Sequence, residues 1–169
     1  MKKLNCDVLI IGSGLIGLAT AHCLSSFGYD IIIADSRVFG EKKISLKDTR
    51  TVAISEGSKI FLDDLSLWNS LVKYVEPIKK IKVFDRSLVN KIFFENKERS
   101  ENLGYVIENS IFSKVLRNKL KKISNVKILY GHKLNNIISD ANFSKSYFAD
   151  QIIKAKIIIA ADGKNSQIK

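Results

Sequence analysis

The chain has 169 residues, of which 46% are hydrophobic and 27% are charged. This is ordinary globular composition, which excludes a disordered chain, and the length suits one domain with a hydrophobic core. The formal net charge of +11 raises the question of a nucleic acid or an anionic lipid as partner. The lysines are scattered and never form a long tract, so we expect no nucleic acid partner.

The sequence also argues against export and against a membrane span. Two cysteines are too few for a disulfide framework. No stretch approaches the roughly 18 uninterrupted apolar residues of a spanning helix. The N-terminus could be read as a secretory signal with a cleavage site at Ala19-Thr20-Ala21, but Asp7 and several glycines interrupt the apolar run. We therefore expect a cytoplasmic protein.

The first 35 residues predict a strand, a helix and a second strand. Residues 7–11 are a continuous apolar run, typical of a strand buried on both faces of a parallel sheet. A glycine-rich turn leads into a helix over residues 15 to about 27, which ends at Gly28. A second apolar strand, over residues 30–34, is followed by an acid, Asp35. This order is a βαβ unit.

The turn carries the pattern Gly-x-Gly-x-x-Gly at Gly12, Gly14 and Gly17. In a dinucleotide-binding unit the first glycine permits the tight turn, the second lets the backbone approach a pyrophosphate, and the third lets the helix pack on the strand. The start of the helix offers N–H groups and a positive dipole end to the phosphates. Asp35 can accept hydrogen bonds from ribose hydroxyls and disfavours a 2′-phosphate. The unit predicts FAD or NAD rather than NADP; the alternative is a glycine-rich turn that binds nothing.

The rest of the chain predicts further strands and two amphipathic helices. The helical patterns cover residues 56–72 and 110–123. The expected strands cover residues 76–85, 92–94, 126–130, 134–138, 147–153 and 156–161. The last of these runs directly into Asp162 and Gly163.

Four segments together carry a family resemblance. They are the N-terminal glycine motif, Asp48-x-Arg50-Thr-x-Ala-x-Ser55, Leu103-Gly-Tyr-Val-x-Glu-Asn109 and Ala161-Asp-Gly-x-Asn-Ser166. With them the chain resembles the FAD-dependent aromatic monooxygenases of the para-hydroxybenzoate hydroxylase fold, and among these the ubiquinone-biosynthesis hydroxylases. The resemblance implies an α/β, Rossmann-like FAD/NAD(P)-binding domain of that type, lacking its C-terminal part. Residues 1–169 would be an incomplete FAD-binding domain, with the βαβ unit at 1–35 and strands of the substrate-side sheet at about 76–103.

The resemblance also implies an activity. In this family FAD is reduced by NADH or NADPH and reacts with O₂, and the resulting flavin hydroperoxide hydroxylates an aromatic ring. The implied substrate is a polyprenylated aromatic ring, and the implied partners are a C-terminal partner chain or a multienzyme complex. Such a substrate suggests peripheral contact with the inner face of the membrane. The alternative is a standalone or remnant module that binds FAD or NAD without turnover.

The resemblance assigns roles to further residues. Arg50 is expected at the FAD pyrophosphate, Asp162 and Gly163 near the flavin phosphates or ribose, and Asn109 and Arg117 along the FAD cleft; Asn109 is equally well the N-cap of its helix. The residues expected to bind the cofactor are Gly12, Ser13, Gly14, Leu15, Ile16, Gly17, Asp35, Ser36, Arg50, Asn109, Arg117, Asp162 and Gly163. No catalytic residue can be named. Neither His22 nor His132 has neighbours at metal-ligand spacing, so no metal site is expected.

Overall fold

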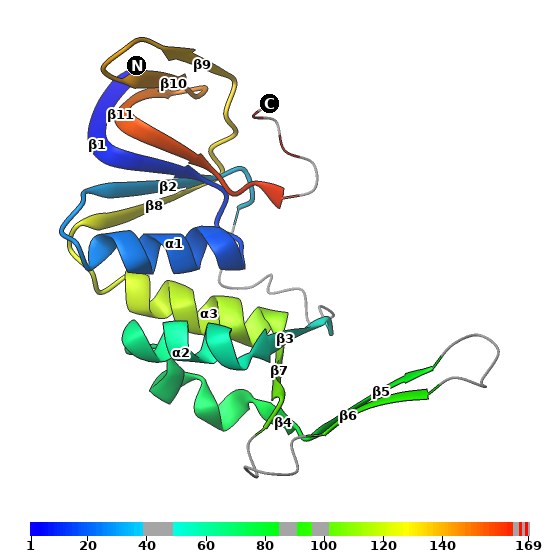
Figure 1. Ribbon diagram of the computed structural model, residues 1–169. Coiled ribbons are helices and arrows are strands. Elements are labelled where there is room, and N and C mark those ends of the chain that lie inside the picture. The colour runs from blue at the N-terminus through cyan, green and yellow to red at the C-terminus, as the bar shows by residue number, and fades with distance from the viewer. Residues whose placement is uncertain (39–48, 85–90, 96–101, 164–165, 167, 169) are drawn as a thin grey trace. The chain divides into compact units, whose positions relative to one another are not determined.

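The computed structural model describes residues 1–38, 49–84, 91–95, 102–163, 166 and 168 (Figure 1). The chain divides into two compact units. Unit 1 comprises Met1–Lys47 together with Ser113–Lys169, and unit 2 comprises Asp48–Phe112. Each unit is described by itself.

Unit 1 is built on a six-stranded sheet with the order β8-β2-β1-β11-β10-β9. Its strands are β1 (Lys2–Ile11), β2 (Ile31–Asp35), β8 (Val126–Tyr130), β9 (Asn136–Ser139), β10 (Ser144–Tyr147) and β11 (Gln151–Ala160). The first four strands in the sheet order are parallel, whereas β10 is antiparallel to both β11 and β9. The central position of β1, between β2 and β11, explains why its sequence is apolar on both faces.

Both faces of the sheet are covered where β1 and β2 pair. Successive side chains of a strand point to opposite faces, and Ile10 and Leu9 on β1 are both fully buried. Helix α1 (Leu15–Ser25) connects β1 to β2 and lies along one face of the sheet (Figure 1), where its Leu18 is buried. The buried cluster on the other face consists of Leu9, Ile11, Ile32, Ala34, Leu134, Phe148, Ile153 and Ala155. The predicted βαβ unit is therefore present, with two packed faces.

A second helix, α3 (Asn109–Leu120), leads from unit 2 into unit 1. Its Leu116 and Leu120 are fully buried. The ring Nε2 of His22 on α1 donates a hydrogen bond to the carbonyl of Leu116 at 3.0 Å, because a carbonyl can only accept. Within the described parts of the chain, no helix is long and apolar enough to cross a lipid bilayer.

Unit 2 contains a three-stranded antiparallel sheet with the order β3-β7-β4. Its strands are β3 (Thr51–Ser55), β7 (Gly104–Glu108) and β4 (Glu76–Ile78), and β3 is followed by helix α2 (Glu56–Asp64) and by the short 3₁₀ helices η1 (Trp68–Ser70) and η2 (Val72–Tyr74). The hydroxyl of Ser55 caps α2 by accepting from the amide of Ser58. The rings of Trp68 and Tyr105 meet edge to face, with centroids 4.8 Å apart.

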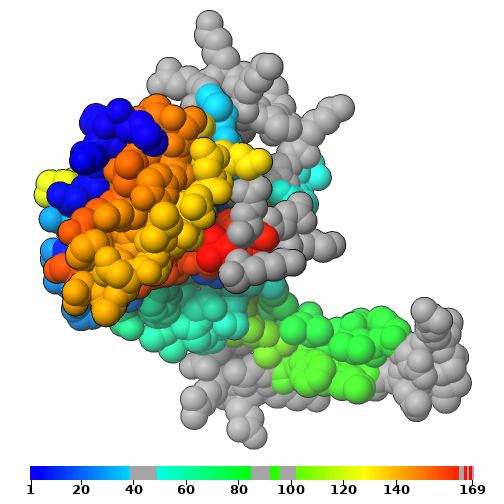
Figure 2. Space-filling model, turned by 90° about the horizontal axis from the view of Figure 1, so that it is seen from above, coloured from blue at the N-terminus to red at the C-terminus, as the bar shows by residue number. Residues whose placement is uncertain are grey.

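The remaining strands of unit 2, β5 (Lys80–Phe84) and β6 (Lys91–Glu95), form a two-stranded antiparallel sheet of their own. Among the described residues they pair with no other strand. Six large apolar side chains of this hairpin have exposed fractions between 41% and 60%: Ile81, Val83, Phe84, Ile92, Phe93 and Phe94. Figure 2 shows the green side chains of β5 and β6 at the surface. So many exposed apolar side chains in one place are unusual on a protein surface. A two-stranded hairpin by itself also gains little stability in water.

The structure corrects several predicted elements. The strand predicted over residues 76–85 is divided into β4 and β5, which belong to different sheets. The helix predicted over residues 56–72 ends at Asp64, because Ser66 has a left-handed backbone (φ 54°) and 3₁₀ turns follow. The strands predicted at 147–153 and 156–161 are instead the end of β10 and the single long strand β11, joined by a turn at residues 148–150. In that turn the amide of Phe148 donates to the carbonyl of Gln151 at 2.9 Å.

Candidate functional site

The carboxyl ends of three neighbouring parallel strands meet at one pocket in unit 1. The amide of Gly12, after β1, donates to the carbonyl of Ala34 on β2, and the amide of Ala161, after β11, donates to the carbonyl of Ile11, both at 2.8 Å. The pocket has a volume of about 470 Å³ and is lined by Ile11, Gly12, Gly14, Ala34, Asp35, Ser36, Arg37, His132, Lys133, Leu134, Ala161, Asp162 and Gly163. Open α/β sheets bind their ligands at this edge of the sheet.

The three motif glycines have different surroundings. Gly12 has a φ of +105°, and a Cβ there would collide with the carbonyl of Ala161. A Cβ on Gly17 would collide with the carbonyl of Gly12, so α1 packs directly on the turn. Gly14 has ordinary angles (φ −72°, ψ −178°), and a Cβ there meets no heavy atom within 4 Å. Gly12 and Gly17 thus allow the turn to pack, whereas Gly14 leaves open space beside the pocket that it lines.

Helix α1 starts immediately after this open space. Gly14 is its N-cap and makes no side-chain capping bond, and the first turn contains no acidic residue. The first amides of a helix have no partner within the helix, and they lie at the positive end of its dipole. The side chain of Ile16 is 72% exposed, so Leu15 and Ile16 can serve a ligand through their backbone amides. This end of α1 is suited to an anion such as a pyrophosphate.

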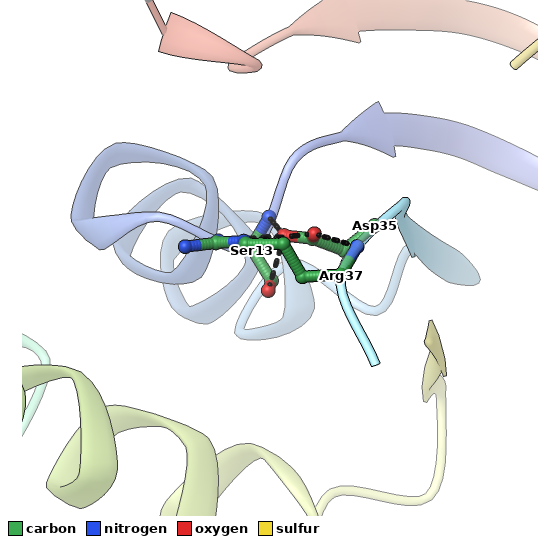
Figure 3. Close-up of polar contacts among 3 residues, drawn as sticks. All are labelled: Ser13, Asp35 and Arg37. Carbon is green, nitrogen blue, oxygen red and sulfur yellow. Dashed lines mark hydrogen bonds and ion pairs between the residues drawn. The ribbon is translucent and has the colours of Figure 1, made fainter. Parts of the chain in front are cut away.

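Asp35, at the end of β2, is bonded to both Ser13 and Arg37 (Figure 3). Its Oδ2 accepts hydrogen bonds from the Ser13 amide at 2.7 Å, the Ser13 hydroxyl at 2.6 Å and Nη2 of Arg37 at 2.7 Å. Its Oδ1 accepts from the amide of Arg37 at 2.8 Å and from Nε at 3.0 Å. The Asp35 side chain is 4% exposed and that of Arg37 is 58% exposed. Sequence reasoning identified Ser13 and Asp35 and missed Arg37, which no motif marks.

These hydrogen bonds keep both Asp35 and Arg37 in their charged forms. Burial by itself raises the pKa of Asp35, but the hydrogen bonds from Arg37 and Ser13 outweigh burial and hold that pKa well below its usual range. The hydrogen bond to Asp35 in turn raises the pKa of Arg37. At neutral pH the pocket therefore contains an ionised carboxylate in contact with a guanidinium.

A segment that sequence reasoning did not assign to the site also lines the pocket. Strand β8 pairs in parallel with β2. Backbone hydrogen bonds continue between the two segments that follow these strands. The amide of His132 donates to the carbonyl of Asp35 at 2.9 Å, and that of Gly131 donates to the carbonyl of Arg37 at 3.0 Å. Residues 132–134 are thereby held at the pocket. The presence of residues 132–134 at the pocket follows from the pairing of β8 with β2, which no sequence motif marks.

Arg117, on α3, belongs to the same electrostatic environment although it does not line the pocket. Burial lowers its pKa, the neighbouring Tyr130 opposes this effect, Arg37 lowers the pKa further and Asp35 raises it. Burial also raises the pKa of Tyr130, against the effect of Arg117. The role predicted for Arg117 toward FAD stays a prediction.

Arg50 and Asn109 lie in unit 2, where the two sequence segments that contain them are adjacent. Strands β3 and β7 pair with Thr51 opposite Glu108, and the amide of Asn109 donates to the carbonyl of Arg50 at 2.9 Å. Asn109 is the first residue of α3. Neither Arg50 nor Asn109 lines the pocket of unit 1, and their contact with FAD stays a prediction. Asp48 and Asn165, from the motifs that carry the resemblance, lie outside the described residues.

The structure thus brings together the predicted residues nearest the strand ends. Those that line the pocket are Gly12, Gly14, Asp35, Ser36, Asp162 and Gly163. Ser13 and Gly17 are buried beside it. Among the described residues, no three His, Cys, Asp or Glu side chains gather in a way that could hold a metal ion.

Comparisons with known proteins agree on the family. A family model described as "FAD binding domain" matches residues 5–169. The chain is 26% identical over 164 residues to the ubiquinone hydroxylase UbiL of Rhodospirillum rubrum and 24% identical over 166 residues to the 3-demethoxyubiquinol 3-hydroxylase of Escherichia coli. Each match covers 96% of this chain but only 38% and 42%, respectively, of those proteins. The chain therefore spans about two fifths of their length.

Solved structures show the same fold. The p-nitrophenol 4-monooxygenase PnpA of Pseudomonas putida superposes with a TM-score of 0.80 at 20% identity, over 99% of this chain and 43% of that one. PqsL of Pseudomonas aeruginosa, described as a probable FAD-dependent monooxygenase, gives 0.78 at 13% identity, over 97% and 44%. The predicted fold class, that of para-hydroxybenzoate hydroxylase, is confirmed. The chain belongs to the FAD-binding domain family.

Proposed function

We propose that this chain is the FAD-binding part of a flavin-dependent aromatic-ring hydroxylase of ubiquinone biosynthesis. The observation that carries the proposal is the pocket at the ends of β1, β2 and β11, where the glycine turn, Asp35 and the Asp162-Gly163 turn meet. The support for the pathway comes from relatives named as ubiquinone hydroxylases. When bound, FAD would pass electrons from NADH or NADPH to O₂, so that one oxygen atom enters the ring.

The residues of the pocket fit such a cofactor. The open side of Gly14 and the first amides of α1 would hold the pyrophosphate. The ionised Asp35 would accept hydrogen bonds from the adenosine ribose. Asp162 and Gly163 lie directly after β11 at the same pocket and would lie near the flavin phosphates or ribose. The chain's own task in this account is to bind and orient the cofactor.

The proposed substrate is an aromatic ubiquinone precursor with a polyprenyl tail. The names of the relatives support the ring; the tail, and the peripheral membrane contact that it would require, follow from the family resemblance. The expected donor is NADH or NADPH. The test is oxidation of NADH or NADPH by the FAD-loaded chain with and without a short-tailed precursor: FAD binding with no oxidation in either case would favour a binding module without turnover.

We further propose that the β5–β6 hairpin is covered by polypeptide in the working enzyme. Ile81 lies opposite Phe94 and Val83 opposite Ile92. Opposed residues share a face of a sheet, so these four apolar side chains form one exposed face. The relatives contain more than twice the length that this chain matches. The proposed cover is the polypeptide that corresponds to the rest of those relatives, carried by this chain or by a partner chain.

The cofactor proposal is tested by titrating FAD into the purified chain and following flavin fluorescence. Gly14→Val fills the open space beside the pocket and is expected to abolish saturable FAD binding. The matched control is Gly57→Val: Gly57, on α2, also has no heavy atom within 4 Å of an added Cβ, and it does not line the pocket. Loss of binding in both variants, or in neither, would contradict the proposed site.

A further inference from the structure

We infer that the guanidinium of Arg37 and the ribose diol of the cofactor compete for the same edge of the Asp35 carboxylate. This inference rests on the proposed function, because it concerns how FAD enters the proposed site. It assigns to Arg37 a role that the sequence pattern does not suggest.

The first step is the hydrogen-bonding capacity of the carboxylate. An ionised carboxylate offers about four lone-pair directions. Asp35 already accepts five hydrogen bonds, two from Ser13 and three from Arg37. These five already exceed that number, so the two vicinal hydroxyls of a ribose can bind only where present donors leave. Replacement of two donors by two hydroxyls would keep the number at five.

The five donors to Asp35 differ in how freely they can move away from it. The amides of Ser13 and Arg37 belong to the backbone that follows β1 and β2, and the carbonyl of Arg37 accepts from the amide of Gly131. Ser13 is only 1% exposed, so its hydroxyl has little room to move. The guanidinium is different, because the Arg37 side chain is 58% exposed and can turn toward solvent.

The third step is the match in geometry. The guanidinium places one donor on each oxygen, Nε on Oδ1 and Nη2 on Oδ2. A vicinal diol would do the same, with one hydroxyl on each oxygen. Figure 3 shows the Arg37 side chain folded back along the carboxylate. Arg37 is therefore a positioning residue that keeps Asp35 ionised and oriented, and its side chain yields when the adenosine ribose binds.

The inference is tested with FAD titrations of the wild-type chain, Arg37→Leu and Arg37→Lys. Removal of the competing fork is expected to tighten FAD binding by about two- to fivefold, in line with the modest strength of an exposed ion pair. Arg37→Lys retains the charge without the fork and is expected to bind FAD more tightly than wild type as well. Lys154→Leu removes the same charge from β11, outside the pocket, and is expected to leave the dissociation constant unchanged.

A second pair of probes isolates the diol. ADP displaces FAD through the same ribose and phosphates, whereas 2′,3′-dideoxy-ADP lacks both hydroxyls. In Arg37→Leu, ADP and FAD are expected to gain affinity equally, so displacement of FAD by ADP should stay unchanged, whereas displacement by the dideoxy compound should weaken by about two- to fivefold. Equal or weaker FAD binding by Arg37→Leu, in a wild-type chain that binds FAD, would overturn the inference and leave the proposed function standing. A wild-type chain that binds no FAD would contradict the proposed function itself.

Discussion

At the scale of single residues, the glycine motif combines two physical roles. Gly12 and Gly17 are required by packing, because a Cβ on either would collide with backbone. Gly14 is not required by packing, because a Cβ there meets no heavy atom within 4 Å; under the proposed function it leaves room for the pyrophosphate. The sequence pattern predicted all three positions, since it records the close approach of turn, helix and strand. It could not predict Arg37, whose contact with Asp35 depends on the path of the chain after β2.

This difference predicts losses of stability of different size for two similar substitutions. Gly17→Ala is expected to lower the free energy of unfolding by about 1–3 kcal/mol, because the methyl group overlaps the carbonyl of Gly12. Gly14→Ala is expected to cost about 1 kcal/mol or less, since only the N-cap preference changes. Urea unfolding followed by circular dichroism measures both values. Equal losses in the two variants would contradict the packing role of Gly17.

At the scale of elements, the sequence pattern predicted the strands and helices that depend on residues close together in the chain. The unit β1–α1–β2 followed from apolar runs and the glycine turn, and β8 lies at 126–130 as expected. The turn that joins β10 to β11 was missed because residues 147–153 were predicted as one strand, although the polar pair Asp150-Gln151 interrupts the apolar residues there. The sequence did not predict that residues 132–134 line the pocket. Their position depends on the pairing of β2 with β8, two strands that are far apart in the sequence.

The contact between α1 and α3 predicts a pH dependence of stability. Burial lowers the pKa of His22, the hydrogen bond to Leu116 opposes this effect, and Lys119 lowers the pKa further. The unfolded chain therefore binds more protons than the folded chain as the pH falls below about 6.5, the usual pKa of histidine. Stability from this group is complete above that pH and is lost as the pH falls toward the lower pKa of the folded chain.

The test compares wild type with His22→Gln in urea unfolding between pH 7.5 and 5. Glutamine can still donate to the carbonyl of Leu116 but does not titrate, so the variant should lose less stability over this range than wild type. Parallel curves for the two proteins would show that His22 does not carry the effect.

The exposed face of the β5–β6 hairpin predicts self-association of the isolated chain. Contiguous apolar surface associates in water, so sedimentation velocity at increasing concentration should reveal oligomers. Phe94→Thr, within the apolar face, is expected to reduce them. The control is Phe27→Thr, which removes an equally large side chain that is 73% exposed and lies outside the hairpin. A monomeric wild-type chain at all concentrations would argue against a covered hairpin.

At the scale of the whole molecule, the chain combines a known family fold with the cofactor site proposed above. The family model and the solved structures establish an FAD-binding fold over nearly the whole chain. Unit 1 contains the complete pocket described above, whereas unit 2 contains the exposed hairpin. Division into two units could not be read from the sequence, because unit 2 is an insertion between β2 and β8, two strands that pair in space.

The most direct test of the central claim is the dissociation constant of FAD for the wild-type chain, measured by flavin fluorescence with and without a large excess of NAD. We predict saturable FAD binding that excess NAD does not displace, because the family model that matches residues 5–169 is that of an FAD-binding domain. A folded chain that binds no FAD, or that exchanges FAD readily for NAD, would contradict it.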